Sequence, residues 1–222
     1  MNKPISYFIG EGLLIVFSIL MALGVNEWRV RNGQHAEEHK AVADIAAELV
    51  ENRALLDGLP DYHRSVGNAL NQLAQDLGSA ETADPRTPIE LFMSLDNLRP
   101  SVIIQQPPQD VSWQTAKDRG VAARFDYETA KTLSLAYDSQ MSSVNDVYEE
   151  VNRSLIRPDM YKAQDQDAAL GPLIALFYEM SAREVGLMER IDQSLAALRE
   201  DYPKTTAKAI GPSPSSGEPA PH

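Results

Sequence analysis

The sequence predicts an all-α protein made of one N-terminal transmembrane helix, an antiparallel helical bundle and a disordered C-terminal tail. A dense apolar run fills residues 5–25, and apolar residues then recur at steps of three and four. Such steps place apolar side chains on one face of a helix, and no convincing run alternates with the period of two typical of strands. Proline, glycine and serine dominate from Lys204 onward. We therefore expect an anchor with its interfacial flank over 1–33, a helical domain over 34–203 and a tail over 204–222.

The apolar run has the length of a membrane span. Its 21 residues (5–25) make roughly 31 Å of helix at ~1.5 Å per residue, close to the ~30 Å of hydrocarbon in a bilayer. The apolar part of a cleaved signal peptide is shorter, about 7–15 residues. The small residues Ala22 and Gly24 offer only a weak cleavage site because Val25 and Asn26 follow. We expect a retained anchor, with a cleaved signal as the alternative.

Residues suited to a membrane interface flank the run. Tyr7 lies near one end, and Trp28, Arg29 and Arg31 follow the other. Aromatic rings with a polar atom favour the boundary between hydrocarbon and water, and arginine charges there meet lipid phosphate. We therefore expect these four residues at the interface and the lipid bilayer as a partner.

Glu11 is unusual inside an apolar run. A charged residue at the centre of a membrane helix costs about 2.5–3.5 kcal/mol on insertion scales. Together with Ser18, Ala22 and Asn26, it forms a stripe of small and polar residues on one helix face. Such stripes are typical of helix–helix contacts in lipid, so the stripe predicts a second copy or another membrane protein as a partner. The alternative is that Glu11 is protonated or reaches the membrane surface.

The N-terminus resembles an uncharacterised family of bacterial single-span membrane proteins. Their membrane helix has a G-E-x-x-L-I-V pattern and ends in N-x-W, and an arginine-containing stretch and a helical domain follow. The residues that carry the resemblance are Gly10-Glu11, Leu14-Ile15-Val16, Ile19-Leu20, Ala22-Leu23 and Val25-Asn26-x-Trp28. A looser likeness spans Trp113 to Gly120. The resemblance implies the same architecture and the bacterial inner membrane, and it names no activity.

The side of the membrane that holds the helical domain stays open. The resemblance implies a periplasmic domain. The count of positive charges favours a cytoplasmic domain by a small margin, because Lys3 precedes the run whereas Arg29, Arg31 and Lys40 follow it.

Apolar periodicity and end signals define the helices of the domain. Thr87 before Pro88 and Asp126 before Tyr127 are typical of residues that cap a helix N-terminus. Gly120 is typical of a helix end, and Asn32-Gly33 is a point where the first helix could bend or break. The helices expected from these signals span residues 42–56, 66–78, 88–98, 110–120, 127–155 and 173–198.

Composition narrows the possible functions. The net charge is −12, and no long Lys/Arg cluster exists that could displace the counterions of a nucleic acid, so we expect no nucleic-acid partner. The chain has no Cys, which excludes disulfides and thiolate catalysis.

One motif could carry chemistry. His35, Glu38 and His39 fit H-x-x-E-H, a zinc-peptidase pattern in which two histidines share a metal and the glutamate acts as base. A working site also needs a third ligand, and His63 is the one additional histidine nearby. We interpret the motif as a solvated helix face and expect no metal or cofactor.

These patterns favour a membrane-anchored interaction, scaffold or accessory protein without enzymatic activity. A ligand-sensing domain coupled to the membrane helix is the first alternative, and a zinc-dependent peptidase is the second. Trp113 with Lys117 and Arg119 could form a small recognition patch, but a tryptophan in a short amphipathic helix is more often part of the core.

Overall fold

The computed structural model describes residues 5–81, 84–99 and 107–210, with the backbone alone for residues 5–13 and Ile15. Within these ranges the regular elements are helical and no strand occurs, so the all-α prediction is confirmed. The long helices are α1 (Ile5–Leu55), α2 (Leu59–Ser79), α5 (Tyr127–Ser139), α6 (Asp146–Leu155) and α7 (Gln166–Asp201). The short ones are α3 (Pro88–Met93), α4 (Val111–Asp118) and α8 (Pro203–Ile210).

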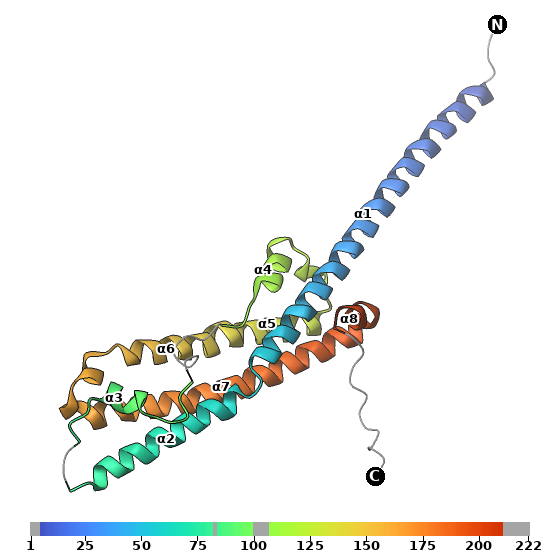
Figure 1. Cartoon of the computed structure of the whole chain (residues 1–222). Helices are drawn as coiled ribbons and strands as arrows, with labels where there is room; N and C mark the ends of the chain where they lie inside the picture. The colour runs from blue at the N-terminus through green and yellow to red at the C-terminus, as the bar shows by residue number, and fades with distance from the viewer. Residues whose placement is uncertain (1–4, 82–83, 100–106, 211–222) are drawn as a thin grey trace, which may run out of the picture.

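Helix α7 lies at the centre of the bundle. Helix α2 packs along one side of α7, and α5 and α6 pack along another (Figure 1). All three run antiparallel to α7. The apolar residues that recur at helical spacing meet in one core, which includes Leu70, Leu133 and Phe177. The predicted antiparallel helical bundle is therefore confirmed.

The turn between α1 and α2 is shorter than the gap between the helices expected over 42–56 and 66–78. Gly58 adopts a left-handed conformation with φ of +72°, which glycine tolerates because it has no Cβ. Helix α2 then begins at Leu59 with Pro60 in its first turn, where a proline costs no hydrogen bond. Farther along α2, Gly67 allows a close approach to α7, because a Cβ at Gly67 would lie 3.3 Å from the ring of Tyr178.

Helices α5 and α6 follow the single long helix predicted over 127–155, with one irregularity. The π-helical turn η3 (Gln140–Asn145) joins them. Arg183 of α7 donates a hydrogen bond of 2.7 Å to the carbonyl of Ser143 within this turn. The apolar pattern contains no sign of the turn, because buried residues continue through it at helical steps.

Two expectations about element boundaries need correction. Helix α1 continues unbroken through Asn32 and Gly33, so the expected boundary between anchor and domain falls inside a helix. The prediction that disorder begins at Lys204 is wrong for residues 204–210, which belong to α8. Thr206 is buried, and Ile210, one turn later, packs against the core, so α8 is held against the domain by its own apolar face. The remainder of the predicted tail, 211–222, lies outside the described residues.

The N-terminal half of α1 projects away from the bundle (Figure 1). Its described apolar side chains are exposed, for example Phe17 at 63 % and Leu20 at 61 %. In the described part of the chain, no helix combines the length and the apolar character needed to cross a membrane. The transmembrane helix therefore stays a prediction.

Candidate functional site

The residues of the predicted helix–helix stripe lie on the projecting half of α1. Ser18, Ala22 and Asn26 are exposed there, whereas the side chains of Glu11 and Tyr7 lie outside the described residues. The Ser18 hydroxyl donates to the carbonyl of Leu14, one turn earlier, at 2.8 Å. Association through this stripe stays a prediction.

The predicted interface residues after the apolar run are also exposed. Trp28 and Arg29 are exposed on α1, and Arg31 pairs with Glu27 on the same helix at 2.8 Å. Their placement at a membrane interface stays a prediction.

The H-x-x-E-H motif lies where α1 meets α7 and α8. The Glu38 carboxylate accepts a hydrogen bond of 2.6 Å from the hydroxyl of Tyr202, and the His39 ring lies 2.8 Å from the Thr205 hydroxyl. His35 is exposed, with 70 % of its side chain accessible. Burial and the hydrogen bond to Glu38 raise the pKa of Tyr202. Glu38 and His39 thus hold the C-terminal part of the chain against α1, so the interpretation as a solvated helix face is wrong for Glu38 and applies to His35.

The motif residues do not converge on a shared point. His35 and Glu38 are 3.8 Å apart, and His63 lies in the core, paired with Glu184. Among the described residues, no group of three or more metal-binding side chains is placed to hold an ion.

The fully buried Glu184 forms the first of two polar clusters that sequence reasoning missed. Its carboxylate accepts a hydrogen bond of 2.5 Å from the hydroxyl of Tyr148 and lies 2.8–2.9 Å from Nδ1 of His63. Burial and the adjacent negative charge raise the pKa of Tyr148. This cluster ties α2, α6 and α7 together through one carboxylate.

A signal for this cluster exists in the sequence. Glu184 falls between Met180 and Leu187 on the apolar face of α7, at a position where the helical pattern calls for an apolar residue. A charged residue at such a position is buried at a cost unless it is paired. That mismatch could have identified Glu184 as a core residue.

The second buried cluster centres on Glu48 of α1. Its carboxylate accepts hydrogen bonds from the hydroxyl of Tyr137 at 2.7 Å and from the backbone N–H of Ser112 at 2.8 Å. The second bond caps the N-terminus of α4, where a negative charge is favourable. Trp113 stacks on Tyr137 with ring centroids 5.7 Å apart, and it is buried. Its interpretation as a core residue is confirmed.

One turn later on α1, Asn52 binds the backbone of the segment that leads into α4. Its side-chain amide donates to the carbonyl of Gln109 at 2.6 Å and accepts from the Gln109 N–H at 2.7 Å. Gln140, in the π-helical turn, donates to the carbonyl of Pro108 at 2.8 Å. These buried amides fix an irregular segment against the bundle without depending on its side chains.

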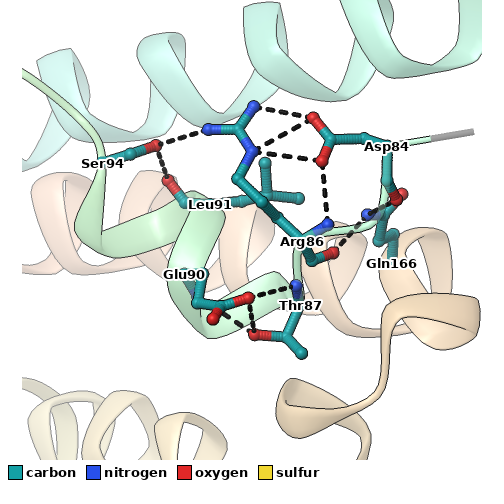
Figure 2. A network of polar contacts seen from close by, with 7 residues as sticks. All are labelled: Asp84, Arg86, Thr87, Glu90, Leu91, Ser94 and Gln166. Atoms are coloured by element: carbon teal, nitrogen blue, oxygen red, sulfur yellow. Dashed lines mark hydrogen bonds and ion pairs between the residues drawn. The ribbon is translucent and has the colours of Figure 1, made fainter.

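A polar network orders the end of the bundle far from the projecting half of α1. Figure 2 shows the Arg86 guanidinium against the Asp84 carboxylate, with a closest contact of 2.7 Å. Hydrogen bonds from Arg86 hold the pKa of Asp84 below its ordinary value. The side-chain amide of Gln166, at the start of α7, donates to the backbone carbonyls of Asp84 and Arg86. The segment before α3 is thereby joined to α7.

Helix α3 begins with a capping box, which includes the N-cap that the sequence predicts at Thr87. The Thr87 N–H donates to the Glu90 carboxylate at 2.8 Å, and the Glu90 N–H donates to the Thr87 hydroxyl at 3.4 Å (Figure 2). The helix ends at Met93 instead of Leu98. We call the residues Met93, Ile156 and Tyr161 the distal surface. Met93 ends α3, Ile156 directly follows α6, and Tyr161 ends the turn η4 (Pro158–Tyr161), which contacts α3.

The distal surface is apolar and accessible. Ile156 is 73 % exposed and Tyr161 is 55 % exposed.

Comparison with known proteins adds no relative. No protein-family model, no curated protein and no solved structure matches the chain. The resemblance of the N-terminus to bacterial single-span proteins therefore stays an expectation, and the functional argument depends on the geometry.

Proposed function

We propose that the protein is a single-pass membrane protein whose helical bundle acts as an interaction, scaffold or accessory module. One observation carries this proposal: α1 runs without a break from an exposed apolar segment into the core of the bundle. Phe17 and Leu20 are exposed in its first half, whereas Val42, Ile45 and Leu49 are buried in its second half.

The exposed half of α1 supports an anchor. Leaving a large apolar side chain in water costs about 1.5–3 kcal/mol relative to burial. Several such side chains follow one another on this helix without a partner in the described bundle, and contiguous exposure of this kind is typical of membrane or protein contacts. These side chains are Leu14, Val16, Phe17, Ile19, Leu20, Met21, Leu23 and Val25.

An unbroken helix would hold the bundle at a defined place relative to the bilayer. The stretch from Val25 to Leu55 corresponds to about 45 Å of helix at ~1.5 Å per residue. The contacts of Glu38, Glu48 and Asn52 fix this helix to the rest of the domain. The distal surface lies at the opposite end of the bundle and is the part we propose to meet a partner protein.

Chemical cross-linking tests this role. The chain has no Cys, so a photoactivatable group can be attached to a single introduced cysteine. We expect Ile156→Cys and Tyr161→Cys to capture the same partner in intact cells, and the exposed Asn71→Cys on α2 to capture none. Equal adducts from all three positions, or none from the distal surface, would exclude the distal surface as the contact site.

A ligand-sensing role is the second candidate. The continuity of α1 favours it, because a shift of the bundle would be transmitted directly to the anchor. We place the protein in the bacterial inner membrane by the resemblance of its N-terminus. A membrane-impermeant maleimide added to intact cells distinguishes the two orientations: it labels Asn71→Cys only if the bundle is periplasmic, as the resemblance implies.

A further inference from the structure

A hollow between α1 and α8 is lined by basic side chains. His39 and Lys40 contribute from α1, and Lys204, Thr205 and Lys208 contribute from α8. None of the described residues that line it is acidic. We call it the α1–α8 hollow.

One of its lysines, Lys204, has no structural role that accounts for it, whereas Lys208 lies in the last turn of α8, where a cation is favourable. Lys40 pairs with Asp44 at 2.6 Å, but Lys204 and Lys208 make no ion pair or hydrogen bond with any described residue. Lys204 is the second residue of α8, and a cation in the first turn opposes the helix dipole. The stability of α8 therefore does not explain Lys204.

The remaining lining adds one pair of polar groups and small apolar side chains. The His39 ring and the Thr205 hydroxyl are hydrogen-bonded to each other at 2.8 Å and add polar groups beside the lysines. Ala43 and Ala209 complete the lining with small side chains that leave room. Lysine acts as a point charge toward phosphate and presents up to three donors.

We propose that the α1–α8 hollow binds the phosphate group of a soluble molecule, with Lys204 and Lys208 as the main contacts. A phosphate group matches the site because its charge and its acceptor oxygens are concentrated in a small volume. None of the described lining residues carries a negative charge, and the carboxylate of Asp44, the residue after Ala43 on α1, pairs with Lys40.

The preference for a soluble molecule over a lipid rests on the proposed membrane anchor. The phosphate site itself does not depend on that anchor. Lys40 comes 15 residues after Val25, which is about 22 Å along α1. The headgroup layer adds only about 5–8 Å on each side of the hydrocarbon, and charges are screened over ~8 Å at physiological salt. A headgroup would therefore lie out of reach of the hollow.

The test is a calorimetric titration of the full chain with inorganic phosphate at low salt. The chain is measured in detergent and in nanodiscs of phosphatidylcholine alone. We compare the wild type with Lys204→Gln/Lys208→Gln and with a control, Lys131→Gln/Lys162→Gln, which removes two lysines outside the hollow. Lys204 and Lys208 are both exposed, so the first variant should fold normally by circular dichroism.

We expect the wild type to bind phosphate, the hollow variant to bind about tenfold more weakly and the control to change less than about twofold. No binding by the wild type, or equal loss in both variants, would overturn the site. A second set of nanodiscs contains phosphatidylglycerol. If Lys204→Gln/Lys208→Gln weakens binding to these discs but leaves the binding of inorganic phosphate unchanged, the proposal that the phosphate group belongs to a soluble molecule is wrong. Failure to enter nanodiscs contradicts the anchor alone, because the detergent titration still decides the site.

Discussion

Replacing Tyr148 by Phe should alter how the stability of the protein depends on pH above about 10. The hydroxyl of Tyr148 is buried and donates to the Glu184 carboxylate. Burial first, and then the charge of Glu184, raises its pKa above the ordinary value near 10. The folded protein therefore keeps this proton at a pH where the unfolded chain releases it.

The sign and size of the effect follow from proton linkage. Because the folded state holds one more proton than the unfolded state, the free energy of unfolding falls as pH rises above about 10. A single tyrosine contributes a slope of about 1.4 kcal/mol per pH unit in this range, and its contribution is fully present below pH 10. Tyr148→Phe removes this part of the slope. At neutral pH the variant should lose about 1.5–3 kcal/mol with the hydrogen bond to the carboxylate.

The assay is urea unfolding of the full chain in detergent, followed by circular dichroism at several pH values between about 9 and 11.5. The exposed Tyr127, replaced by Phe, serves as the control because its ring makes no buried hydrogen bond with described residues. We expect the slope of the control to match the wild type. A Tyr148→Phe slope equal to that of the wild type would show that this hydroxyl titrates as it does in the unfolded chain, and the reasoning would fail.

Three further changes test the packing and the polar contacts. Asn52→Ala should lower the free energy of unfolding by about 2–4 kcal/mol, because two backbone groups lose their hydrogen-bond partners. The control Asn71→Ala, at an exposed position, should change it by less than about 0.5 kcal/mol, and urea unfolding measures both. Gly67→Leu should lower the free energy of unfolding by about 1–3 kcal/mol, because the larger side chain forces α2 away from α7. Gly78→Leu is the control, since its side chain would meet open space. Equal unfolding midpoints for the two variants would contradict the close approach of α2 and α7 at Gly67. His35→Ala should change stability by less than about 0.5 kcal/mol and leave metal content unchanged, so a stoichiometric zinc lost in the variant would refute the solvated-face interpretation.

Local signals in the sequence predicted much of the fold. Thr87 and Asp126 cap their helices as expected, with Asp126 accepting from the N–H of Glu128. Gly120 ends the helix region of α4 with φ of +67°. These features depend on neighbours within a few residues, so the sequence is sufficient to find them.

The buried polar clusters could not be placed from the sequence because their partners are distant along the chain. Glu48 meets Tyr137, and Glu184 meets His63 and Tyr148, through packing of separate helices. The sequence indicates only that a polar residue occupies an apolar-face position.

Helix α8 was missed for a different reason. The proline-rich composition of the last residues concealed its short apolar face, in which Thr206 and Ile210 lie one turn apart. Pro203, its first residue, suits the first turn of a helix.

The most direct test of the central claim is alkaline extraction of membranes from cells that produce the full chain. We expect the wild type to stay with the membrane pellet and Phe17→Arg/Leu20→Arg to appear in the soluble fraction, because two charges in hydrocarbon oppose insertion by about 5–7 kcal/mol on insertion scales. A wild-type chain that is released by alkali, or that lacks residues 5–25 when its mature N-terminus is mapped, would contradict the account.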